Sequence, residues 1–136
     1  MSAFLRFEVF GTPQPQGSAR AFVVKGRAVV TSANPNLKDW RNLVSVAARE
    51  AMAGLPPVDG AVEVNVVFWL ARPKSVKRAS VTVKPDIDKC LRAVLDSLTS
   101  VVFQDDAQVV LVGASKHYCD DEHPTPRAEV SVWTQP

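Results

Sequence analysis

The spacing of apolar and polar residues along the chain predicts strands and helices in the order β-ββ-α-β-α-β-β. Apolar alternation predicts strands, and these cover residues 4–10, 21–24, 28–31, 61–70, 107–118 and 128–133. Apolar residues at helical spacing predict helices at residues 37–53 and 87–99. This order predicts an α+β fold in which a mixed β-sheet is packed by two helices, within a single domain over residues 1–136.

The second predicted helix has the cleanest amphipathic pattern in the chain. Its apolar stripe consists of Ile87, Cys90, Leu91, Val94, Leu95 and Leu98. At about 100° per residue, Asp88 falls at the border of this stripe beside Leu95, and Asp96 falls on the polar side. We therefore expect Asp88 to lie in a cleft and Asp96 to take no part in a site.

The first predicted helix and the strands carry packing positions and no chemistry of their own. Asn36 is expected to cap the helix at residues 37–53, with Trp40, Leu43 and Val44 in the core. The strand at residues 61–70 ends in an unbroken apolar run, which predicts a central strand buried on both faces. Residues 81–83 are expected to be extended, and residues 128–133 to form an edge strand.

Composition narrows the class of protein. No apolar run approaches the ~20 residues that a membrane-spanning helix needs, and the first residues lack the basic and apolar regions of a secretion signal. Cys90 and Cys119 are too few for a disulfide framework. We therefore expect a cytoplasmic protein with reduced thiols and no membrane partner.

The net charge of +2 does not by itself indicate a nucleic-acid binder, but the charges are unevenly distributed. Seven basic residues and only two acids lie between Arg72 and Arg92, whereas acids dominate between Asp120 and Glu129. A basic segment beside a small acidic pocket suits a polyanion held against a metal ion. The alternative is a solvated lysine-rich loop.

Two acidic pairs bracket the helix at residues 87–99. Asp86 and Asp88 stand at its start, and Asp105 and Asp106 follow its end. Carboxylates are the ligands that Mg²⁺ prefers, and Mg²⁺ can activate water for phosphodiester hydrolysis. If the strand after Asp106 folds back beside the segment ending at Val83, the carboxylates meet at one sheet edge. The alternative is that Asp86 caps the helix, that Asp88 is a first-turn residue favoured by the helix dipole, and that the second pair forms an ordinary polar turn.

The same stretch resembles the signature of the RusA-type crossover-junction endonucleases, which resolve Holliday junctions. The matching residues are Lys84-Pro85-Asp86-Ile87-Asp88, the helix from Leu91 to Leu98, and Asp105-Asp106-Ala107-Gln108-Val109. Weaker likeness extends to residues 11–15 with Arg20, and to residues 116–118. The resemblance implies a RusA-like fold and a Mg²⁺-dependent endonuclease (with Mn²⁺ as an alternative ion) that cuts branched DNA such as a four-way junction. It also implies a homodimer in a bacterial or phage-infected cell.

The resemblance also implies residue roles. Asp86, Asp88 and Asp106 would be the metal-binding catalytic carboxylates, with Asp105 close by. The family's catalytic lysine falls on Arg92, which keeps the charge and could clamp a phosphate but cannot donate a proton as lysine might. The asparagine that commonly follows the D-x-D falls on Lys89. The expected DNA-binding residues are Arg20, Lys74, Lys77, Arg78, Lys84, Lys89 and Lys116.

Two other functions fit part of the pattern. A non-catalytic DNA-binding protein would use the carboxylates only as helix caps, and a different D-x-D metal-dependent phosphohydrolase would act on small phosphates. The chain offers no second nucleotide-binding element for the latter. His117, Cys119 and His123 are a weak zinc signal, since no C-x-x-C pair accompanies them.

Overall fold

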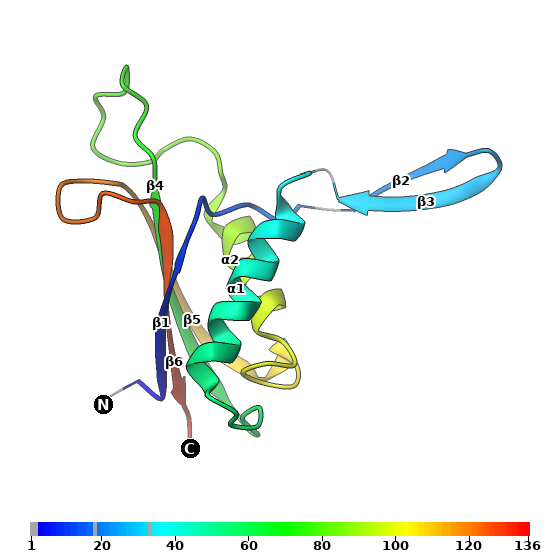
Figure 1. Cartoon of the computed structure of the whole chain (residues 1–136), viewed down its shortest axis with the longest axis vertical. Coiled ribbons are helices and arrows are strands. Elements are labelled where there is room, and N and C mark those ends of the chain that lie inside the picture. Colours follow the sequence, from blue (N-terminus) through cyan, green and yellow to red (C-terminus); the bar gives the residue numbers. More distant parts are fainter. Residues whose placement is uncertain (1–2, 18, 33) are drawn as a thin grey trace.

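The computed structural model describes residues 3–17, 19–32 and 34–136, with the backbone alone for residues 19–22 and 29–32. The elements are β1 (Leu5–Phe10), β2 (Ala19–Val24), β3 (Arg27–Ser32), α1 (Leu37–Met52), β4 (Val62–Leu70), α2 (Ile87–Leu98), the short 3₁₀ helix η1 (Asp106–Gln108), β5 (Val109–Tyr118) and β6 (Arg127–Thr134). Their order confirms the prediction (Figure 1).

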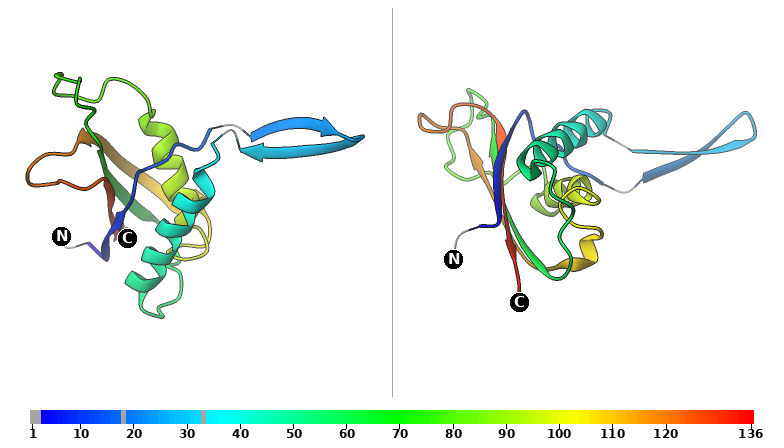
Figure 2. Two further views of the ribbon diagram at one scale, coloured as in Figure 1. Left: turned by 45° about the horizontal axis from the view of Figure 1, so that its top comes forward. Right: turned by 60° about the horizontal axis from the view of Figure 1, so that its bottom comes forward.

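Four of the strands form one mixed sheet in the order β1-β6-β4-β5. β6 pairs antiparallel with β1 and with β4, whereas β4 and β5 are parallel. The parallel pair requires a crossover, and α2 supplies it. Strands β2 and β3 form a separate antiparallel hairpin that projects from the body of the molecule (Figures 1 and 2).

Both helices cover the same face of the sheet (Figure 2). Every second residue of β4 is buried, and those from Val62 to Phe68 pack in the core that the helices share, whereas Leu70 packs with Val81 and Tyr118. From α1 the core takes Trp40 and Val44, but Leu43 is 47% exposed, so its predicted core position was wrong. From α2 it takes Cys90, Ala93, Val94, Ser97 and Leu98. The α+β class with a mixed sheet and two helices is therefore confirmed.

Three local predictions were wrong, because each depended on which elements lie beside the segment in the folded chain. β6 is an inner strand between β1 and β4, not an edge strand. β4 is central as predicted, but only one of its faces is buried, because both helices lie on that side. Residues 81–83 form no strand, and only Ser80 makes an isolated bridge, to His117.

Asn36 stands at the N-cap of α1 as predicted, although its side chain makes no capping hydrogen bond. The structure contains no helix in its described residues that is long and apolar enough to cross a membrane.

Candidate active site

Asp86 and Asp88 lie at the start of α2, and Asp86 occupies its N-cap position with extended backbone. The Asp86 side chain makes no capping hydrogen bond; its Oδ2 accepts from Lys89 Nζ at 3.0 Å instead. This hydrogen bond, followed by the lysine charge, lowers the pKa of Asp86 below its usual value, and the same contact raises the pKa of Lys89. A simple capping role therefore does not explain this carboxylate.

Asp88 is exposed and, among the described residues, accepts no hydrogen bond and forms no ion pair. The buried face of α2 is centred between Ala93 and Val94, so Asp88 faces away from the core. The expected position in a cleft at the border of the buried face was wrong. Its carboxylate is instead open to solvent at the positive end of the helix dipole.

Asp105 and Asp106 have different environments although they are adjacent. Asp105 caps η1, accepting from the amide of Ala107 at 2.8 Å, and shares a capping box with Gln108. Asp106 is exposed, and no hydrogen bond or ion pair engages its carboxylate within the described part of the chain. Of the two, Asp106 is the one free to bind an ion.

Gln108 explains why this turn is rigid. Its side-chain oxygen accepts from the amides of Gln104 and Asp105, and its nitrogen donates to the carbonyls of Val58 and Gly60, all at 2.8–3.0 Å. The residue was noted in the sequence motif without a role. No local sequence signal could have found its partners some fifty residues away.

The two acidic pairs do not meet within one chain. The 12 residues of α2 span about 18 Å at 1.5 Å per residue. β5 does return beside the segment ending at Val83, but it does so with its far end, at Lys116. Asp106 lies just before its near end, so the condition for one shared sheet edge is not met. Across the described residues, no group of three His, Cys, Asp or Glu side chains is placed to hold a metal ion.

Lys116 lies close to the first acidic pair. Its amino group donates to the carbonyls of Val83 and Pro85, each at 2.8 Å. These contacts tie β5 to the segment that leads directly into Asp86, across the cis Lys84–Pro85 peptide. Lys116 therefore positions the start of α2. This role differs from the DNA contact that the sequence predicted for it.

A groove of about 530 Å³ runs past Asp86. It is lined by Lys84, Pro85, Asp86 and Lys89 on one side, and by Pro15, Gly17, Asn34 and Pro35 on the other. A second hollow of about 320 Å³ shares Pro15, Lys84 and Pro85, and continues toward Arg78 and Tyr118. A further hollow of about 810 Å³ lies elsewhere, between α1 and the end of α2. Its Asp96 accepts a hydrogen bond from Gln16 and stays outside the site.

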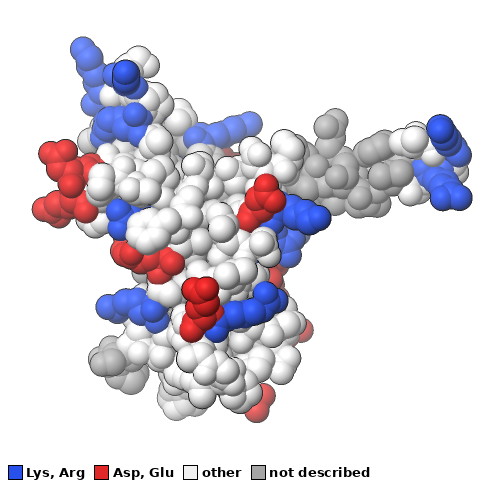
Figure 3. All heavy atoms as spheres, viewed as in Figure 1, with Lys and Arg blue, Asp and Glu red and all other residues white. Residues whose placement is uncertain are grey.

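The remaining predicted DNA-binding residues fall into three groups. Lys74, Lys77 and Lys84 are exposed, and none forms an ion pair with any described residue. The same holds for Arg92, the residue expected at the position of the family's catalytic lysine. Arg78 instead donates to the Tyr118 hydroxyl at 2.7 Å, and Arg72 stacks over the same ring at 4.5 Å, so both anchor the basic loop. The side chain of Arg20 lies outside the part that the structure describes. Figure 3 shows a group of Lys and Arg side chains at the upper end of the molecule, in the same view as Figure 1.

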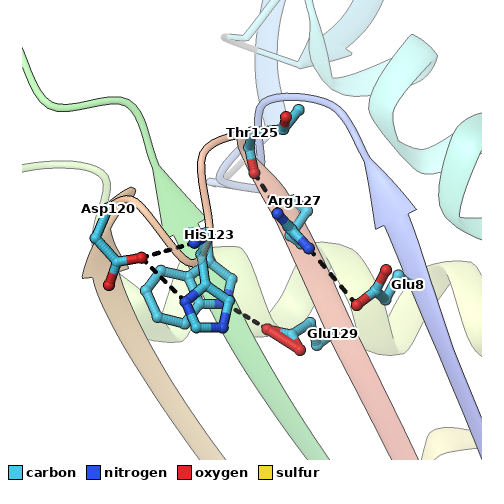
Figure 4. A network of polar contacts seen from close by, with 7 residues as sticks. Glu8, Asp120, His123, Thr125, Arg127 and Glu129 are labelled. Atoms are coloured by element: carbon cyan, nitrogen blue, oxygen red, sulfur yellow. Dashed lines mark hydrogen bonds and ion pairs between the residues drawn. The ribbon is translucent and has the colours of Figure 1, made fainter.

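The histidines of the weak zinc signal have other contacts (Figure 4). His123 stacks on Trp69 with ring centroids 3.8 Å apart, and its Nδ1 lies 3.1 Å from Asp120. Trp69 also donates to Glu129. These contacts hold the acidic loop against β4 and β6. Neighbouring Arg127 pairs with Glu8 at 3.6 Å on the same open face of the sheet.

Comparison with known proteins identifies the family to which the chain is similar. The family model of endodeoxyribonuclease RusA matches residues 11–133. The uncharacterized protein YqaN of Bacillus subtilis (strain 168) is 27% identical over an alignment of 140 positions, which covers 94% of this chain and 94% of YqaN.

Proposed function

Because the chain belongs to the RusA family of endodeoxyribonucleases, which cut branched DNA with a divalent metal, we propose that it resolves four-way junctions with Mg²⁺ held by Asp86, Asp88 and Asp106. Mn²⁺ would fit the same oxygen ligands. The observation that carries the proposal is the pair of carboxylates at the start of α2, half-buried Asp86 and exposed Asp88, with Asp86 in a groove that Lys84 and Lys89 also line. A metal bound there would lower the pKa of a water molecule and neutralise phosphate charge.

The protein supplies the positive charge that must hold the DNA backbone. Lys84 and Lys89 line the groove beside Asp86, and exposed Arg92 follows Asp88 by one helical turn. An arginine can bind a phosphate with two parallel hydrogen bonds. We assign Arg92 to phosphate binding and not to proton transfer, since its guanidinium stays protonated.

The distance between the acidic pairs favours a site built from two chains. β5 is an edge strand, and it exposes Val110, Leu111 and Val112 by 63%, 54% and 45%. An exposed apolar edge strand is a surface that proteins usually cover. A second copy pairing antiparallel across this edge would cover it in both chains, as a two-fold axis requires.

Such pairing would also complete the metal site. If the two-fold axis passes through Val112, residues at the same sequence distance before and after Val112 face each other in the two chains. The partner's residue 108 then lies across from Lys116. Lys116 contacts the residue before Asp86, and Asp106 stands two residues before Gln108. Each site would therefore combine Asp86 and Asp88 of one chain with Asp106 of the partner subunit. A homodimer would hold two such sites, one for each strand to be cut.

Cleavage of a synthetic four-way junction, compared with a linear duplex of the same sequence, tests the activity. We expect cutting of the junction in Mg²⁺ and none with EDTA. Asp88→Asn should fold and bind the junction, because the exposed Asp88 side chain forms no hydrogen bond or ion pair within the described residues. It should not cut the junction, because one of the proposed metal ligands is lost. Junction cleavage that persists in Asp88→Asn would overturn the assignment.

Mixing two inactive variants tests the composite site. Asp88→Asn and Asp106→Asn chains, unfolded and refolded together, form heterodimers with one doubly altered site and one intact site. We expect the mixture to nick one strand of the junction, whereas each variant alone is inactive. If each site came from one chain, the mixture would stay inactive.

A further inference from the structure

The hairpin of β2 and β3 is separated from the core that the other elements share. Its strands form their own two-stranded sheet and project away from the body (Figures 1 and 2). Six residues per strand give a length of about 20 Å at 3.3 Å per residue. An isolated hairpin is only marginally stable in water, so an arm of this kind calls for a partner that it contacts.

The charge of this part of the chain is one-sided. No Asp or Glu occurs between Glu8 and Asp39, whereas Arg20, Lys25, Arg27 and Lys38 do. Lys25 and Arg27 are exposed at the tip of the hairpin and form no ion pair with the residues that the structure describes. Figure 3 shows the cations at the end of the arm. The tip therefore fits a polyanion.

The backbone conformation of the turn does not explain why a lysine stands at position 25. Val24 pairs with Arg27, which leaves a two-residue loop, and both Lys25 (φ 50°) and Gly26 (φ 77°) have positive φ. Such type I′ turns strongly prefer Asn-Gly, because few residues other than glycine and asparagine adopt positive φ readily. Lys25 occupies a position that asparagine would fill with less strain, so its charge needs another explanation.

The base of the arm adjoins the candidate active site. Gly17 and Asn34, on either side of the hairpin, line the same groove as Asp86 and Lys89. DNA held at Asp86 would pass the base of the arm. At 3.4 Å per base-pair step, an arm of about 20 Å reaches roughly six base pairs further along a duplex.

We propose that the β2–β3 hairpin is a DNA-binding arm, in which Lys25 and Arg27 contact phosphates of a duplex leading into the junction. A two-stranded ribbon has the width that the major groove of DNA accepts. The proposal rests on the proposed function for its substrate, and it adds an element that grips the duplex away from the cutting site.

Binding of a four-way junction at several salt concentrations tests the arm. All proteins carry Asp88→Asn, so that binding is measured without cleavage. The test protein adds Lys25→Asn and Arg27→Gln; asparagine before Gly26 keeps the turn favourable. The control adds Arg6→Gln and Arg49→Gln, which remove two exposed cations outside the arm, one in β1 and one in the last turn of α1. Thermal unfolding of each protein checks its fold.

We expect the test protein to bind about tenfold more weakly at moderate salt. Its plot of log K against log salt should be shallower by about 2, since each lost phosphate contact removes about 0.9 from the slope. The control should match its parent. An unchanged slope in the test protein would overturn the proposal.

Sedimentation of the same proteins separates another use of the arm. If the test protein dissociates into monomers while its parent stays dimeric, the arm grips a second copy of the chain and the DNA-binding proposal is wrong. The result is independent of cleavage. If the chain that keeps Asp88 cuts no junction, the proposed function is refuted, while the salt slopes of the Asp88→Asn proteins still decide the role of the arm.

Discussion

Lys116→Met tests whether the site depends on the contact between β5 and the segment before α2. The substitution keeps most of the side-chain stem and removes the amino group that donates to the carbonyls of Val83 and Pro85. Those carbonyls would lose their partner. The backbone leading into Asp86 would then be held less firmly.

The magnitude follows from the two contacts. A hydrogen bond from a charged donor contributes about 1.5–3 kcal/mol, and solvent weakens the more exposed of these two, which leaves a loss of about 2 kcal/mol. For a chain of this size each kcal/mol shifts the melting temperature by roughly 3–4 °C, so we expect a decrease of roughly 6–8 °C. Because Asp86 would be less well positioned, junction cleavage should also require more Mg²⁺.

Circular dichroism during heating and a Mg²⁺ titration of junction cleavage provide the measurements. Lys74→Met is the matched control, since Lys74 is exposed and lies in the basic loop. It should weaken junction binding without changing the melting temperature or the Mg²⁺ requirement. If Lys116→Met behaves like this control, Lys116 acts by contacting DNA, and the positioning argument fails.

Three further predictions concern single side chains. Gln108→Leu removes four hydrogen bonds to backbone groups and should lower the free energy of unfolding in urea by about 2–3 kcal/mol; a change within 0.5 kcal/mol would contradict the role given to this residue. Lys89→Gln should raise the pKa of Asp86 in an NMR titration. Since that pKa is depressed in the folded protein, the pair stabilises the fold above the unfolded-state pKa of about 3.9 and ceases to do so as the pH falls through the folded value. Burial raises the pKa of the Cys90 thiol to about 11, so a thiol reagent followed by mass spectrometry should modify Cys119 first; equal rates would refute this order.

Local patterns in the sequence determined the elements and their order. The apolar stripe of α2 and the alternation of β4 each report the one face that these elements bury, and neighbouring residues are enough to produce such a pattern. The turn at residues 25–27 likewise identified the hairpin. The family resemblance, carried by a short motif around α2, was confirmed by a match over residues 11–133.

Only the tertiary structure decided where those elements lie relative to one another. The alternation of β6 is the same for an inner strand as for an edge strand, because pairing involves residues far away in the chain. In the same way the motif places Asp86 and Asp106 twenty residues apart without stating their separation in space. The parallel crossover from β4 through α2 to β5 sends the two ends of the helix to opposite ends of the sheet. The sequence thus pointed to the carboxylates that we propose as metal ligands, whereas the fold separated them and left β5 as the exposed edge at which, in our proposal, a second chain brings them together.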